Sequence, residues 1–130
     1  MAYYFSTVTS LDYDDAIAKT TEELKKEGFG VLTQIDVKST LKQKIDVDFP
    51  RYIILGACNP QFAHKALEAE AHIGSMLPCN VVVRENKDGQ TEVFAVDPIA
   101  SMSAIENPDL GAIAREVQQK LKTVIDNIQA

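Results

Sequence analysis

The sequence has no tryptophan, only two cysteines, no basic excess and no long apolar run. Its 19 acidic and 13 basic residues give a net charge of −6. A general nucleic-acid binder or a binder of anionic membranes needs a basic face, so this charge excludes both classes. The apolar runs are far shorter than the roughly 20 residues that cross a bilayer. We therefore expect neither nucleic acid nor membrane among the partners.

Signals for secretion or for several domains are also missing. Residues 1–5 lack the basic start and the long apolar core of a signal peptide. With only two cysteines, this predicts a cytoplasmic protein with free thiols. The 130 residues are 45% apolar and contain no linker-like stretch rich in proline, glycine or serine. We expect one domain that spans residues 1–130.

The first half of the chain alternates strand-like and helix-like segments. Tyr3–Thr9 is aromatic and β-branched, which predicts a strand. Ser10 or Asp12 can cap the start of a helix that ends before Gly28, which suits a left-handed cap. Gly30–Val37 alternates apolar and polar positions and predicts a strand with one buried face. Ser39–Ile45 predicts a short polar helix.

The second half adds three strands and two helices. The compact apolar run Arg51–Cys58 predicts a buried strand, and Asn59 followed by proline predicts the start of a helix. Cys79–Glu85 and Thr91–Asp97 predict a hairpin, because the Asp88-Gly89 turn signal lies between them. Residues 73–78 predict a loop or a short turn.

The last segment has the clearest periodicity. A helix beginning at Asn107 carries apolar residues at spacings of three and four, namely Leu110, Ile113, Ala114, Val117, Leu121, Val124, Ile125 and Ile128. Such a stripe must be buried, most simply against a sheet. The fold class predicted is α+β: a mostly antiparallel, twisted sheet of about five strands with helices packed on one face.

Three motifs carry a family resemblance, namely Gly28–Lys38, Ile54–Pro60 followed by His64–Leu67, and Leu77–Val83. Their order resembles the family of domains of unknown function numbered 302. The resemblance implies a small α+β fold with TATA-binding-protein-like topology, often homodimeric, in cytoplasmic proteins of bacteria and archaea. It assigns no activity and no catalytic residues. Gln34 stands where the family pattern leads us to expect an acidic residue.

Cys58 is the strongest candidate for a reactive residue, because of its position in the chain. It ends a strand just before the helix start, where unpaired N–H groups attract negative charge. His64 is a candidate base, and Cys79 is a candidate second thiol if its strand lies beside that of Cys58. The alternative is that both cysteines are small buried apolar residues, as free cysteines usually are.

Two functions follow from these residues. The first is a homodimeric module that binds a small ligand or a protein in a cleft formed by Cys58, Asn59, Cys79 and Asn80. The second is a thiol-dependent enzyme or redox carrier that uses Cys58. We favour the first, because no complete catalytic set is visible in the sequence. The dimer is expected because helices on one face of the sheet leave an opposite face rich in valine, isoleucine and tyrosine.

Metal and anion sites have weaker support. Metal-ligating residue types occur at Cys58, His64, Glu68, His72 and Cys79, but without the spacing of known metal motifs, so we expect no metal and no cofactor. Unpaired N–H groups at the helix starts near Asn59 and Asn107 suit an anion. A small anionic ligand would also suit the basic stretch of Lys38, Lys42, Lys44 and Arg51.

Overall fold

The structure is a computed structural model that describes residues 2–128. The strands are β1 (Tyr4–Thr9), β2 (Gly30–Asp36), β3 (Tyr52–Cys58), β4 (Cys79–Glu85) and β5 (Thr91–Val96). The helices are α1 (Tyr13–Lys26), α2 (Val37–Ile45), α3 (Pro60–Ala69), the 3₁₀ helix η1 (Ala71–Met76), α4 (Pro98–Ser101) and α5 (Pro108–Asp126). Within residues 2–128 no helix is long and apolar enough to cross a membrane.

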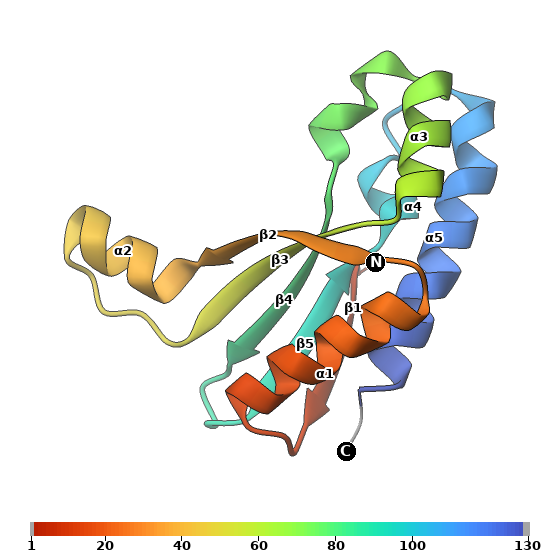
Figure 1. Cartoon of the computed structure of the whole chain (residues 1–130). Helices are drawn as coiled ribbons and strands as arrows, with labels where there is room; N and C mark the ends of the chain where they lie inside the picture. Colours follow the sequence, from red (N-terminus) through yellow and green to blue (C-terminus); the bar gives the residue numbers. More distant parts are fainter. Residues whose placement is uncertain (1, 129–130) are drawn as a thin grey trace.

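The five strands form one sheet in the order β1-β5-β4-β3-β2, and each neighbouring pair is antiparallel. Helices α1 and α5 pack on one face of this sheet (Figure 1). Leu55, Val81 and Val93 meet Leu24 of α1 and Leu121 of α5 in the main core. The predicted α+β class, with its antiparallel sheet of five strands and its helices, is therefore confirmed.

Local signals in the sequence explain where α1 and α5 begin and end. The Asp12 carboxylate accepts a hydrogen bond of 2.9 Å from the Asp15 amide, and Gly28 takes a positive φ of 87° after α1. The Asn107 side chain accepts a 3.0 Å hydrogen bond from the Asp109 amide at the start of α5. The apolar stripe predicted for α5 is buried from Leu110 to Ile128, although Ile113 is only partly covered.

Strand β2 differs from its prediction. Its alternation predicts one buried face, yet none of its residues is buried. Two causes are visible. The strand lies at the edge of the sheet, and a β-bulge between Val31 and Thr33 reverses the alternation. Val31 therefore lies opposite Ala57 on the helix-covered side, whereas Ile35 lies opposite Ile54 on the other side.

Helix α2 stands away from the other helices at the end of β2 (Figure 1). It has no buried residue, in agreement with the short polar helix that the sequence predicts. The Asp36 carboxylate caps its start by accepting a 3.0 Å hydrogen bond from the Ser39 amide. The opposite face of the sheet is therefore left without a helical layer over its centre.

The β4–β5 hairpin is confirmed, and its turn uses the predicted glycine. Gly89 has a φ of 75°, and the Asn86 side chain accepts hydrogen bonds of 3.0 Å from the amides of Asp88 and Gln90. The segment predicted as a loop or short turn before β4 contains the end of η1. This short helix and α4 frame the end of the sheet where the two cysteines lie.

Candidate functional site

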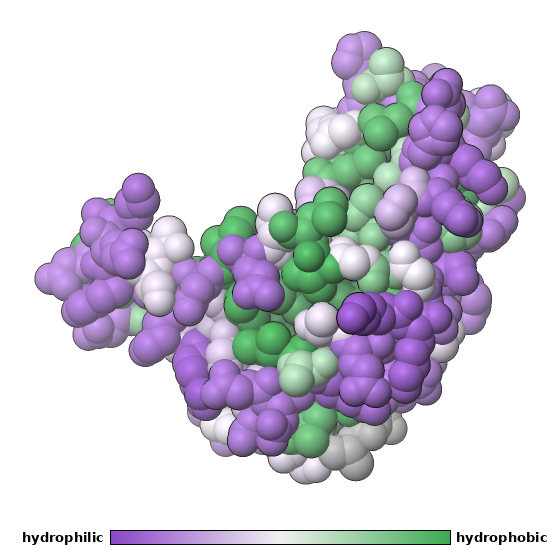
Figure 2. Space-filling model, in the orientation of Figure 1, coloured by the Kyte–Doolittle hydropathy of each residue, from purple (hydrophilic) through white to green (hydrophobic). Residues whose placement is uncertain are grey.

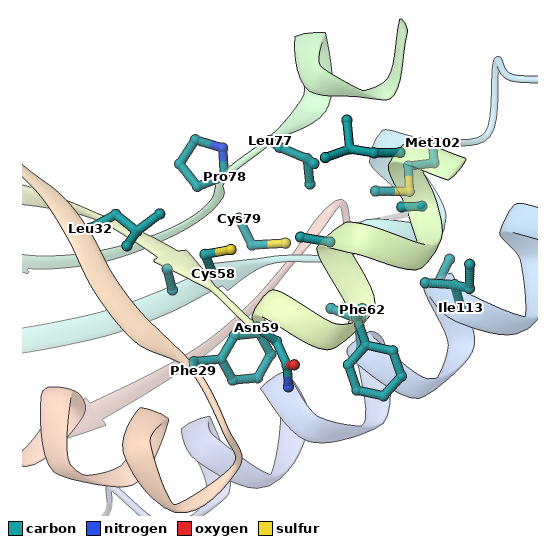
Figure 3. A pocket seen from close by; sticks show the side chains of 16 residues that line it. Phe29, Leu32, Cys58, Asn59, Phe62, Leu77, Pro78, Cys79, Met102 and Ile113 are labelled. Atoms are coloured by element: carbon teal, nitrogen blue, oxygen red, sulfur yellow. The ribbon is translucent and has the colours of Figure 1, made fainter. Parts of the chain in front are cut away.

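A pocket of about 280 Å³ lies at the end of the sheet, where β3 finishes and β4 begins (Figure 3). Sixteen residues line it: Phe29, Leu32, Ala57, Cys58, Asn59, Phe62, Ala63, Ala66, Leu67, Leu77, Pro78, Cys79, Met102, Ile113, Ala114 and Val117. They come from β3 and β4, from the turn before β2 and the bulge within it, from α3 and its N-cap, from the segment before β4, from the residue that follows α4, and from α5. The lining is almost entirely apolar.

The antiparallel register of β3 and β4 brings the two cysteines together. Ala57 pairs with Cys79, so the last residue of β3, Cys58, is next to the first residue of β4. Both sulfurs point into the pocket (Figure 3), and both thiols are free. The structure thus places the two sulfurs at the common end of the sheet that the sequence led us to consider.

The two thiols have different surroundings. Cys79 is only 7% exposed, whereas Cys58 is half-buried at the strand end. Burial raises the pKa of the Cys79 thiol to about 11, and the neighbouring Cys58 adds to this rise. Cys79 is therefore a neutral thiol near pH 7, which suits an apolar wall and disfavours nucleophilic attack by its sulfur.

Asn59 occupies the N-cap position of α3 as predicted, but its side chain makes no capping hydrogen bond to that helix. Its Nδ2 instead donates a 3.3 Å hydrogen bond to the carbonyl oxygen of Glu27, which follows the last turn of α1. The amide thereby connects the α1–β2 turn with the start of α3. Phe29 and Phe62, which flank this connection, form one side of the pocket.

Two other candidates lie away from the pocket lining. His64 is 76% exposed, and its Nε2 lies 3.1 Å from Oε1 of Glu68 on the same helix. Asn80 is exposed and pairs with Gly56 in the sheet. The structure therefore brings Cys58, Asn59 and Cys79 together but brings neither His64 nor Asn80 to them.

The residues weighed for a metal site do not gather either. His72 is exposed, and its Nδ1 lies 3.6 Å from Oε2 of Glu70 rather than near a cysteine. Within residues 2–128, no group of three or more histidine, cysteine, aspartate or glutamate side chains is arranged to hold a metal ion.

Two residues of the basic stretch, Lys42 and Arg51, form ion pairs with nearby carboxylates. Lys42 pairs with Asp46 at 3.0 Å and with Asp48 at 3.1 Å beside α2. Arg51 pairs with Glu85 at 2.8 Å and lies 4.6 Å from the centre of the Tyr13 ring. None of these cations lines the apolar pocket.

For several residues that line the pocket, the neighbouring sequence gives no indication that they belong to a site. Met102 and Ile113 follow Cys58 by more than forty residues and reach the pocket only through the packing of α4 and α5. Pro78 follows a cis peptide bond and lines the wall beside β4. Phe62, Ala63 and Ala66, by contrast, lie on the apolar side of α3 that the sequence marks.

Comparison with known proteins identifies the family to which this fold belongs. The family model described as "Domain of unknown function DUF302" matches residues 5–128. The chain belongs to the DUF302 family. A solved structure, described as "Crystal structure of uncharacterized conserved protein DUF302 from Bacillus stearothermophilus", is similar to it with a TM-score of 0.92. The two sequences are 31% identical, and the match covers 98% of this chain and 99% of that chain. No curated protein matches.

The match confirms the family resemblance seen in the three sequence motifs. Gln34, the position that departs from the expected family pattern, lies on the edge strand opposite Leu55 and does not line the pocket. The pocket of this DUF302 domain is therefore formed without that position.

Proposed function

We propose that this DUF302 protein binds a small apolar ligand in the pocket at the end of β3 and β4. The observation that carries the proposal is the composition of the lining. Apart from the two thiols, Asn59 is the one polar side chain among the sixteen residues, and its amide already donates to Glu27. A concave, apolar site with few polar groups is the usual form of a small-molecule site.

The size and the mouth of the pocket support the same function. An apolar cavity of about 150 Å³ takes up benzene, and this pocket has a volume of about 280 Å³. An apolar group larger than one six-membered ring therefore fits. Leu32 is 68% exposed, and Leu67 is also exposed, so the mouth itself offers apolar surface that a ligand would cover.

Filling the pocket tests this proposal. Titration with the neutral fluorophore N-phenyl-1-naphthylamine measures the affinity for an apolar ligand. Ala63→Leu adds volume from α3 into the pocket and should weaken binding about tenfold or more. Ala18→Leu, on the exposed side of α1, is the matched control and should leave binding unchanged.

Circular dichroism would establish that both variants fold. A wild-type protein that does not bind the fluorophore, or an Ala63→Leu variant that binds it as tightly as the wild type, would show that this pocket is not the ligand site.

We also propose that the protein acts as a symmetric homodimer through the uncovered face of the sheet. One cross-strand row on this face runs through Ile35, Ile54, Val82 and Phe94. The Tyr4 ring packs against Phe94 with the ring centres 5.9 Å apart. Figure 2 views the molecule from the side on which α1 lies, and on that side hydrophobic residues also gather between α2 and α3.

Val82 is already buried, but Ile35 is exposed and Ile54 and Phe94 are half-buried. A two-fold axis would place this face against the same face of a second copy and remove its exposed apolar surface from water. Sedimentation at micromolar concentration should give a dimer. A monomer at that concentration would contradict the proposal.

Thiol chemistry is the second candidate function, because two free thiols point into one pocket. Alkylation by iodoacetamide, followed by mass spectrometry, separates it from ligand binding. If the pocket only binds, Cys79 stays unmodified at pH 8 until the protein unfolds, since its pKa is about 11. Rapid alkylation of Cys58 below about pH 7, where an ordinary thiol is largely protonated, would instead favour a reactive thiol.

A further inference from the structure

A second pocket borders the apolar one. It has a volume of about 270 Å³ and lies between α4 and the first half of α5. Met102 and Ala114 line both pockets, so these two side chains form the partition between them. An elongated ligand that began beside the two cysteines would meet this partition at its far end.

One of the two side chains in this partition is a flexible methionine. Met102 follows the last residue of α4, is half-buried and packs at the border of the smaller core around Ile73 and Leu110. Methionine is unbranched and adapts its conformation at low cost. Figure 3 shows Met102 across the pocket from Cys58 and Cys79. A ligand that occupied both pockets would pass between the flexible Met102 side chain and the small Ala114 side chain.

The second pocket differs from the first in charge. Arg115 is its one charged lining residue, and its guanidinium lies over Gly111, where an added Cβ would come within 3.5 Å of Nη1. Within residues 2–128, no ion pair or hydrogen bond involves the Arg115 side chain. Arg115 is exposed, so its guanidinium is solvated at the rim of the second pocket and can exchange water for a ligand.

The neutral polar side chains of this pocket are already engaged. Nδ2 of Asn107 donates a 2.8 Å hydrogen bond to the carbonyl oxygen of Ala69, and Oγ of Ser103 donates one of 2.9 Å to that of Ala100. The polar recognition offered by the second pocket is thus cationic. A guanidinium suits a carboxylate particularly well, because it can donate two parallel hydrogen bonds.

We propose that the ligand is an amphipathic carboxylic acid, with its chain in the apolar pocket and its carboxylate paired with Arg115. This inference rests on the proposed function, since the chain must first occupy the apolar pocket. It adds the chemical class of the ligand and its orientation: the tail lies toward Cys58 and Cys79, and the head lies beyond Met102.

Competition against N-phenyl-1-naphthylamine by decanoate and by 1-decanol tests the head group. Decanoate should compete more strongly in the wild type, and its advantage should fall as salt is added. Arg115→Ala should weaken decanoate about tenfold or more and leave 1-decanol unchanged. Arg115→Lys should keep part of the preference. Lys122→Ala, which removes an exposed cation from the same helix, is the control and should change neither ligand.

The outcomes separate this inference from the function on which it rests. If 1-decanol and decanoate compete equally and Arg115→Ala alters neither, the apolar pocket binds ligands but the assignment of the head group is wrong. If neither compound nor the fluorophore binds, the proposed function itself fails. Loss of both decanoate and 1-decanol binding in Arg115→Ala would also overturn the assignment, because it would indicate a damaged pocket.

Discussion

The two faces of the sheet are both apolar, but only one is covered within the chain. On the covered face, Leu55, Val81 and Val93 are completely buried under α1 and α5. On the open face, Tyr4 is 40% exposed and Ile35 is 48% exposed. Apolar residues in a strand therefore do not by themselves reveal which face forms the core; the apolar stripes of the helices decide it.

The number of helices with an apolar stripe explains why only one face of the sheet is covered. Helix α5 has one long apolar stripe and α1 a shorter one, and together they cover one face of a sheet of five strands. Helix α2 has no buried residue and stands apart, so it covers nothing. The covered face thus supplies the stability of the single chain, whereas the open face remains available for association.

The largest expected effect is on the covered face. Leu121→Asp places a charge in the fully buried contact between α5 and the sheet, and we expect a loss of about 3 kcal/mol or more in the free energy of unfolding. Gln119→Asp, on the exposed side of the same helix, should cost less than about 1 kcal/mol. Urea denaturation measures both. Equal losses would mean that the α5 stripe is not the main contact.

The second effect concerns Glu23, the one charged residue among the buried residues described. Its carboxylate is 3% exposed and accepts a 2.8 Å hydrogen bond from Lys26, with Lys19 3.1 Å away. The hydrogen bond from Lys26 lowers the pKa of Glu23 below its ordinary value, and the pairing with Lys19 adds to this. Its stabilising contribution is therefore present above the pKa of the unfolded chain, about 4.3, and is lost as the pH falls through the lower pKa of the folded protein.

Glu23→Gln should reduce this acid-dependent loss of stability, as measured by urea denaturation between neutral pH and acid pH. Glu22→Gln is the control, because Glu22 is exposed and its Oε1 lies 3.7 Å from Lys26. A pH dependence that is the same in the Glu23 variant and in the wild type would contradict the prediction.

The smallest effect on stability is expected on the open face. Ile35→Glu should change the unfolding free energy of the dilute protein by less than about 1 kcal/mol, yet shift the proposed dimer toward monomer in sedimentation. Gln34→Glu, its neighbour on the opposite face of β2, should leave the dimer intact. Dissociation by the Gln34 variant alone would place the interface elsewhere.

Sequence patterns predicted the elements whose signals are local. The α5 stripe, the Asp88-Gly89 turn and the cap at Asp12 depend on neighbouring residues, and all three are present in the structure. The β2 bulge was not predictable in this way, because inserting one residue changes which side faces the core without changing the alternation of residue types.

The candidate site was predictable only in part. Cys58 and Cys79 meet because two strands pair, which the sequence suggested. His64 is exposed because Phe62, Ala63 and Ala66 occupy the inner side of α3. The helical periodicity could therefore have excluded it as a base beside Cys58. Met102 joins the pocket through contacts between distant segments, for which local patterns give no signal.

Gly56 lies under the crossing of two segments that belong to different parts of the molecule. A side chain at this position would collide with Oγ1 of Thr33 on the edge strand and would come within 2.9 Å of Cγ of Pro78 in the pocket wall. One missing methyl group thus allows β2 and the chain before β4 to approach each other across β3. Even alanine at position 56 would force β2 and the segment before β4 apart. The substitution would therefore alter the edge strand and the mouth of the pocket at the same time.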